Sequence, residues 1–171
     1  SMFYLMEYLE GRVFWDPVLP ELNNDERSAV YDDMNRVLAA MHSINVADVG
    51  LGDYGRPGNY FERQVGRWTK QYRASETQTV PAMEELMAWL PENMPAEDDR
   101  VALVHGDYRL DNVMFHPTEP KIIAVLDWEL STLGCPIADF AYLCRPYRDA
   151  LRGVDVAALG IPSEEAFVEA Y

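Results

Sequence analysis

Residues 105–112, HGDYRLDN, contain the side chains of this sequence that are best suited to chemistry. A short apolar stretch at 101–104 precedes them and predicts a strand, and a second strand is predicted at 112–115. The polar run is therefore a loop held between rigid elements, which is where catalytic groups are usually placed. Within it, Asp107 and Asn112 lie five residues apart.

A third strand is predicted at 122–126, and a turn at 116–120 would join it to the second strand as a β-hairpin. Asp127 ends this strand, fifteen residues beyond Asn112, so the hairpin would bring both side chains to one end. Their carboxylate and amide oxygens suit Mg²⁺, with phosphates completing its coordination. Asp107, close by in the loop, could accept the proton of an attacking hydroxyl.

The segments HGDYRLDN and IIAVLDWE resemble the catalytic and metal-binding segments of aminoglycoside phosphotransferases and choline kinases. This resemblance implies a protein-kinase-like fold and transfer of the γ-phosphate of ATP to a hydroxyl of a small molecule. By position it makes Asp107 the catalytic base, and Asn112 and Asp127 the Mg²⁺ ligands. Trp128 and Glu129 stand where protein kinases have Phe and Gly, which favours the small-molecule branch.

Further positions acquire roles from the same resemblance. The opening segment FYLMEYLEG resembles the hinge between the two lobes of these kinases, where the backbone carbonyl of Glu7 and the backbone N–H of Leu9 would face the adenine edge. His105 would organise the catalytic loop. Asp139, in the segment GCPIADFAYL, would help to hold that loop in place.

The resemblance also sets the expected domain boundaries. Residues 1–11 would be the hinge and last strand of an N-terminal lobe that the sequence lacks, and residues 12–171 a C-terminal lobe truncated at its C-terminal end. No lysine precedes Lys70, so the phosphate-binding lysine of that lobe is missing. The motifs resemble most those of kinase-like domains that occur alone or joined to acyl-CoA dehydrogenases. We expect the isolated chain to bind ATP weakly, to transfer phosphate negligibly, and to pair with a second copy through its open hinge strand.

Five helical stretches and three short strands are expected, which makes the fold class α+β, mainly helical with a small hairpin carrying the site. The helices are predicted at 25–43 and from residues 59, 81, 136 and 163, from apolar spacing and capping residues such as Asn59. The apolar stripes of the second and third helices are expected to face the core. Their members are Phe61, Val65, Trp68, Tyr72, Met83, Leu86, Met87 and Leu90.

The charge is strongly acidic, with 14 basic residues against 29 acidic ones and a net charge of −15. This balance argues against a nucleic-acid partner and against an anionic membrane, both of which attract basic surfaces. It suits a cationic substrate, although a solubilising acidic surface is the preferred explanation. Cys135 and Cys144 have no disulfide or metal-binding pattern, which indicates a reducing, cytoplasmic setting. No signal peptide or membrane-spanning run is visible.

The sequence leaves three alternatives to a small-molecule kinase. A metallohydrolase would use His105, Asp107 and His116 as ligands, but His116 lies at the far end of a strand, before a turn. A serine hydrolase is disfavoured because the GxSxG motif is absent. The serious alternative is a catalytically silent kinase-like binding module, against which stands the presence of all three catalytic and metal-binding residues. The phosphate acceptor stays open among amino sugars, choline-like alcohols, sugars, amino acids and hydroxyacyl compounds.

Overall fold

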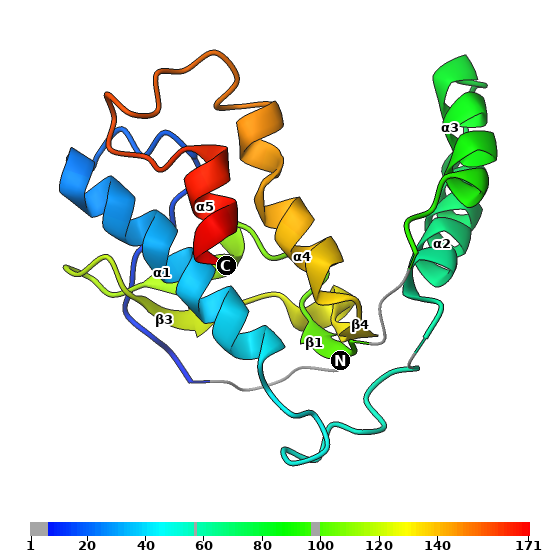
Figure 1. Cartoon of the computed structure of the whole chain (residues 1–171), viewed down its shortest axis with the longest axis horizontal. Helices are drawn as coiled ribbons and strands as arrows, with labels where there is room; N and C mark the ends of the chain where they lie inside the picture. The colour runs from blue at the N-terminus through cyan, green and yellow to red at the C-terminus, as the bar shows by residue number, and fades with distance from the viewer. Residues whose placement is uncertain (1–6, 57, 97–99) are drawn as a thin grey trace.

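The computed structural model describes residues 7–56, 58–96 and 100–171. Helices and two small sheets form a main body, and a pair of helices stands beside it (Figure 1). No helix in these described ranges is long and apolar enough to cross a lipid bilayer. The elements, in chain order, are α1 (Asn24–His42), α2 (Tyr60–Ser75), α3 (Pro81–Glu92), β1 (Ala102–Val104), η1 (Leu110–Asn112), β2 (Val113–Phe115), β3 (Ile122–Val125), η2 (Trp128–Leu130), β4 (Thr132–Gly134), α4 (Pro136–Leu143), η3 (Arg145–Arg148) and α5 (Glu164–Ala170).

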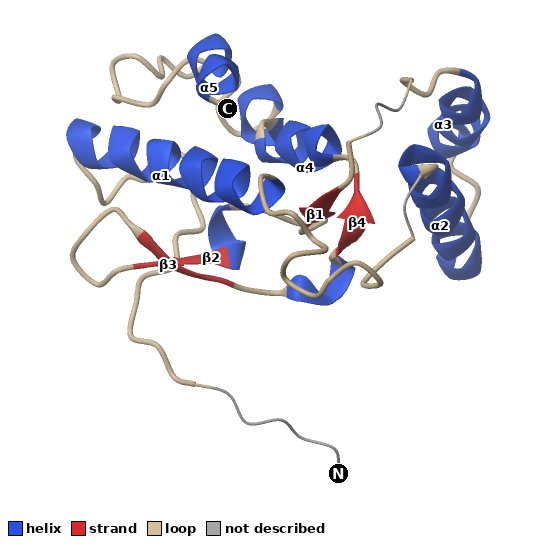
Figure 2. Cartoon of the chain, turned by 60° about the horizontal axis from the view of Figure 1, so that its bottom comes forward, coloured by secondary structure: helices blue, strands red, loops and turns tan. Residues whose placement is uncertain are grey.

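The strands form two antiparallel pairs, one of which contains a strand that the sequence does not predict. β2 and β3 make the expected hairpin, with Val113 opposite Val125. β1 pairs instead with β4, with Leu103 opposite Leu133. β4 escapes prediction because three residues, one of them glycine, are too few to show a period of two. Figure 2 shows α1, α4 and α5 on one side of both sheets.

Helix α1 supports the body along its whole length. Its N-terminus has a capping box, in which the Asn23 side chain accepts from the Glu26 N–H and the Glu26 carboxylate accepts from the Asn23 N–H. Its apolar face is buried as expected, and Val30 and Leu38 are fully enclosed. Because this helix carries the core, it provides a firm base for the loops that lie against it.

Helices α2 and α3 form an arm whose apolar face is covered much less than expected. None of the residues of α3, all of which the structure describes, is buried, and Trp89 is 56% exposed. Trp68 of α2 is 46% exposed, so the expectation that these stripes lie in the core is wrong. Asn59 likewise makes no capping hydrogen bond, because it has left-handed backbone angles instead of extended ones. Helical spacing predicts an apolar face, but it does not show what covers that face.

The N-terminal segment follows the expected hinge only in part. Residues 7–11 are irregular and mostly exposed, and residues 1–6 lie outside the described residues, so the strand predicted from residue 3 is not seen in its described part. Arg12 then forms an isolated bridge with Phe115, through backbone hydrogen bonds of 2.8 Å in both directions. The chain thus joins the body beside the β2–β3 hairpin.

Candidate active site

His105 organises the start of the catalytic loop. Its ring is fully buried, and Nε2 lies 2.7 Å from the carbonyl oxygen of Leu126, to which it donates. Nδ1 accepts from the backbone N–H of Asp107 at 3.3 Å. One imidazole therefore links the loop to the residue that follows β3, and a catalytic role for His105 stays a prediction.

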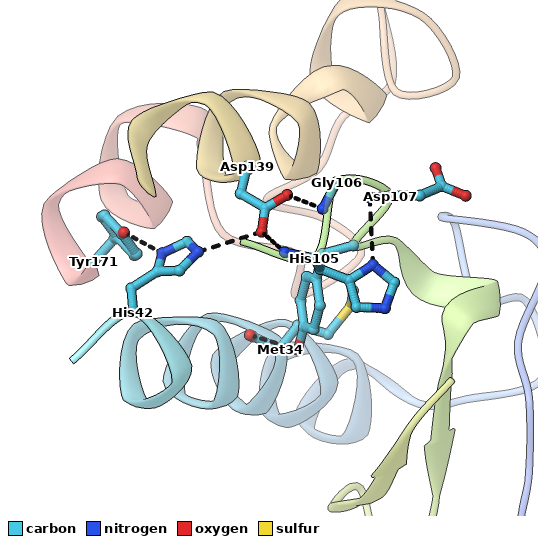
Figure 3. Close-up of polar contacts among 8 residues, drawn as sticks. Met34, His42, His105, Gly106, Asp107, Asp139 and Tyr171 are labelled. Carbon is cyan, nitrogen blue, oxygen red and sulfur yellow. Dashed lines mark hydrogen bonds and ion pairs between the residues drawn. The ribbon is translucent and has the colours of Figure 1, made fainter. Parts of the chain in front are cut away.

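Asp139 holds the backbone of the same loop from the opposite side. Its carboxylate, buried in α4, accepts the N–H of His105 at 2.6 Å and the N–H of Gly106 at 2.8 Å (Figure 3). Hydrogen bonds to a buried carboxylate are stronger than neutral ones and fix the loop against α4. A role of Asp139 in catalysis stays a prediction.

Sequence reasoning missed the groups that orient Asp139. His42, at the end of α1, contacts the Asp139 carboxylate through Nε2 at 3.3 Å, and its Nδ1 lies 2.5 Å from the Tyr171 hydroxyl. Because the carboxylate can only accept, Nε2 donates to it and the tyrosine hydroxyl donates to Nδ1. The His42 side chain is buried, with an exposed fraction of 4%. Its partners are 97 and 129 residues away, so no local signal marks this chain of contacts.

Gly106 has a backbone that other residues tolerate poorly. Its φ is +83°, and a Cβ at this position would lie 2.7 Å from the carbonyl oxygen of Leu130. The loop thus turns sharply at Gly106 and lies in close contact with Leu130, in the segment that follows β3.

Asp107 and Asn112 are joined side chain to side chain. The Asn112 amide nitrogen donates to the Asp107 Oδ2 at 2.8 Å and to the Asp107 carbonyl at 2.9 Å. These bonds turn the Asn112 amide oxygen away from Asp107. The second carboxylate oxygen of Asp107 has no bonding partner among the described residues. Figure 3 shows this carboxylate directed away from the cluster around Asp139.

Asp127 lies at the same end of the hairpin as Asn112, as the sequence predicts. The N–H of Leu126 donates to the carbonyl of Asn112 at 2.8 Å, which places the next residue, Asp127, beside η1. Asp127 is exposed and has left-handed angles, φ 60° and ψ 61°. Such a conformation costs a non-glycine residue free energy and is common at functional sites.

The donor set at this end of the hairpin fits Mg²⁺. An exposed carboxylate on Asp127 and an outward amide oxygen on Asn112 are hard oxygen ligands, and Mg²⁺ commonly takes one or two protein ligands with phosphates. No cluster of three or more His, Cys, Asp or Glu that could bind a metal occurs within the described ranges. Both ring nitrogens of His105 are already used in hydrogen bonds within the protein.

Aromatic side chains pack the catalytic loop from both sides. The His105 ring meets Trp128 at a centroid distance of 5.0 Å and the edge of Tyr108 at 6.0 Å. The Tyr108 hydroxyl donates to the carbonyl of Met34 in α1 at 3.0 Å, and burial raises its pKa. Tyr108 and Trp128 thus connect the loop to α1 and to η2, a role that their motif positions alone do not reveal.

Arg109 and Asp111 neutralise each other at the rim of the loop. Their side chains form a two-point ion pair, and this hydrogen bonding holds the pKa of Asp111 below its usual range. The Arg109 side chain is 46% exposed.

The predicted adenine-contacting residues are the least supported part of the site. Glu7 and Tyr8 are exposed and Leu9 is half-buried in an irregular segment. The contact of Glu7 and Leu9 with adenine stays a prediction.

A pocket of about 180 Å³ lies between the catalytic loop and the arm. Gly106, Leu130 and Tyr142 line it from the body, and residues of α2 line it from the other side. The site therefore has a hollow within reach of its catalytic loop, bounded by two different parts of the fold.

Comparisons with known proteins agree with the motifs. The acyl-CoA dehydrogenase family member 10 of Mus musculus is 50% identical over 177 residues, which cover 99% of this chain and 16% of that protein. A crystallised protein of Ralstonia eutropha JMP134, provisionally described as an aminoglycoside phosphotransferase, is 57% identical with a TM-score of 0.92, over 97% of this chain and 53% of that one. The crystal structure of an aminoglycoside-3'-phosphotransferase of type VIII shares the fold at 18% identity, with a TM-score of 0.65 over 94% of this chain and 58% of that one.

These relatives confirm the kinase-like α+β fold and the resemblance to kinase-like domains of acyl-CoA dehydrogenase family members. The chain spans about a sixth of the mouse protein and about half of the Ralstonia protein. The model of the phosphotransferase enzyme family matches residues 1–171. The chain therefore belongs to the phosphotransferase enzyme family.

Proposed function

We propose that the protein transfers the γ-phosphate of ATP to a hydroxyl group of a small molecule. The observation that carries this proposal is the Asp107 carboxylate, fixed by Asn112 on one oxygen and open on the other, beside the hairpin end that bears Asp127. Because the chain spans only part of its relatives, the activity of the whole protein belongs to the proposal.

In the proposed step, the open oxygen of Asp107 accepts the proton of the acceptor hydroxyl. The hydroxyl oxygen forms a bond to the γ-phosphorus while the bond from that phosphorus to the bridging oxygen breaks, and ADP leaves. The hydrogen bonds from Asn112 hold the carboxylate in one orientation during this transfer. Positioning by Asp139 and His105 keeps the loop in register with the hairpin.

Asn112 and Asp127 would bind Mg²⁺, which when bound neutralises charge on the phosphates. Glu7 and Leu9 would contact the adenine through their backbone, as in the related kinases. We also place the protein in the cytoplasm, and the two buried cysteines, both free, suit a reducing compartment. Pairing of two copies through the hinge strand stays a prediction, because residues 3–6 lie outside the described part.

The test is a phosphorylation screen of the full-length natural protein with Mg-ATP and a panel of hydroxylated metabolites. Once the screen has identified an acceptor, kinetics measured with it should show that Asp107→Asn lowers kcat by roughly 10²–10⁴-fold and leaves KM for Mg-ATP nearly unchanged. Asp127→Asn should raise KM for Mg-ATP by about tenfold or more, because the metal bridges protein and phosphates. Asp48→Asn is the matched control, because Asp48 is an exposed aspartate far from Asp107 in the sequence.

One outcome would favour the silent binding module. If the wild-type protein bound Mg-ATP and modified no acceptor, the catalytic role of Asp107 would be refuted. Turnover that survived both substitutions would refute the kinase mechanism itself.

A further inference from the structure

The charge of α2 is opposite to that of the chain. The whole sequence has a net charge of −15, yet α2 has four basic residues and one acidic residue, a net charge of +3. A basic helix in an acidic protein concentrates positive potential in one place. The pocket beside the catalytic loop lies against this helix.

Helix α2 presents one continuous face to that pocket. Its lining residues follow helical spacing, so they project from the same side of the helix. They are Tyr60, Phe61, Gln64, Arg67 and Trp68. Three of these are aromatic, one is an amide and one is a cation, which together suit a ligand with a flat apolar body and an oxyanion.

The pocket face of α2 is fastened to the sheet that leads into the catalytic loop. The buried ring of Tyr60 packs against Val104 and Cys135, and a Cβ on Gly134 would lie 2.2 Å from this ring. The Arg63 guanidinium donates to the carbonyl of Leu133 at 3.3 Å. The lining from α2 is thus held in place relative to Gly106.

Among the basic residues of α2, Arg67 is the cation that is available to a ligand. Arg63 donates a hydrogen bond to the carbonyl of Leu133, and Arg73 forms ion pairs with Glu76 and Glu84. Lys70 is exposed and does not line the pocket. Arg67 lies over the Trp68 ring at 5.5 Å and has no carboxylate partner among the described residues.

The carboxylate in the pocket lining does not cancel this charge. Asp139 belongs to the lining, but its two oxygens accept the backbone N–H groups of His105 and Gly106. Its side chain is 1% exposed, so it points into the loop and not toward a ligand. Among the charged residues that line the pocket, Arg67 is therefore the one whose charge is available to a ligand.

We propose that this pocket selects acceptors that carry an oxyanion, with Arg67 binding the anionic group and Trp68 packing on a flat apolar part of the same molecule. This inference rests on the proposed kinase function, because the bound molecule is a phosphate acceptor only if the protein transfers phosphate. It adds the chemical class of that acceptor. It opposes the expectation from net charge alone, which favours a cationic acceptor. Guanidinium groups bind carboxylates and phosphates through two parallel hydrogen bonds, and an adjacent aromatic ring supports that arrangement.

The test uses full-length protein and hydroxylated probes that share one aromatic body. They are 3-phenyllactate, which is anionic, 3-phenylpropane-1,2-diol, which is neutral, and phenylalaninol, which is cationic. Calorimetric titration should give 3-phenyllactate a Kd at least about tenfold lower than that of phenylalaninol, with the diol between them. Phenyl phosphate, as a fourth probe, separates phosphate from carboxylate as the preferred oxyanion.

Two substitutions on the same helix make a matched comparison. Arg67→Gln should weaken 3-phenyllactate by about tenfold and leave the diol unchanged, because one charged hydrogen-bonding group is lost. Lys70→Gln removes the same charge from the same helix outside the pocket and should leave every Kd within about twofold. Trp68→Ala should weaken all three aromatic probes.

Equal affinity for the three probes, no binding by any of them, or equal losses in Arg67→Gln and Lys70→Gln would overturn the inference. A loss of Mg-ATP binding in Arg67→Gln without a loss for 3-phenyllactate would overturn it too and assign Arg67 to the nucleotide. Arg67-dependent binding without phosphate transfer to any acceptor would leave the inference standing and refute the kinase proposal. Phosphate transfer with no Arg67 dependence would do the reverse.

Discussion

The body and the arm of this protein are built by different means. In the body, the catalytic loop is held by buried groups that come from α1, α4, β3 and the C-terminal Tyr171. In the arm, α3 has no buried residue among its described positions, and the two helices hold each other through an ion pair between Arg73 and Glu84. The loop that carries Asp107 is therefore held by several elements of the body, while the exposed surface of the arm can change with little effect on the fold.

The largest effect that tests this comparison is expected at Asp139. Asp139→Ala would leave the backbone N–H groups of His105 and Gly106 unpaired in a buried place and remove the partner of His42. We expect it to lower the free energy of unfolding by about 3–5 kcal/mol, measured by urea denaturation. A loss below about 1 kcal/mol would show that the body does not depend on this carboxylate.

Gly106 and Gly153 provide the next test, since both have positive φ but different surroundings. Gly153→Ala has open space around the new Cβ and should cost about 1 kcal/mol of stability for its backbone angles alone. Gly106→Ala also brings its Cβ against the Leu130 carbonyl, so it should cost about 2–4 kcal/mol. Equal losses in the two variants, measured by thermal or urea unfolding, would mean that the loop yields to the extra methyl group.

Tyr171→Phe should have a smaller effect on the body. It removes the hydroxyl that donates to His42 but keeps the ring stacked on Phe140, at a centroid distance of 4.0 Å. We expect a loss of about 1 kcal/mol, which is typical of one hydrogen bond, together with faster amide exchange at His105 and Gly106. Unchanged exchange at those two amides would separate Tyr171 from the catalytic loop.

The smallest effect is expected in the arm. Trp89→Ser removes a large aromatic side chain from α3, yet the side chain is 56% exposed. The free energy of unfolding should change by no more than about 0.5 kcal/mol, as at other surface positions. A loss of unfolding free energy above about 2 kcal/mol would show that α3 is covered in solution. The arm would then not be the exposed, weakly packed part of the molecule that the comparison makes it.

Sequence reasoning succeeded where the signal is local. The helical spacing of α1 is contained in a few adjacent residues, and the loop and hairpin follow from one motif. It failed where a partner distant in the sequence determines the local structure. β4, for example, is a strand because it pairs with β1. The link from His42 to Asp139 and the exposure of α3 depend on tertiary packing in the same way.

The attachment of α2 at its first residue has a mechanical consequence. Tyr60 packs against Gly134, and the rest of the sixteen-residue helix extends away from that contact. The contact would therefore be the pivot of any rotation of α2 against the body. Such a helix is about 24 Å long, so a rotation of about 10° at the pivot carries its far end through about 4 Å. Arg67, roughly 10 Å from the pivot, moves by less than about 2 Å in the same rotation. Such a rotation would therefore displace the far end of α2 more than it displaces Arg67.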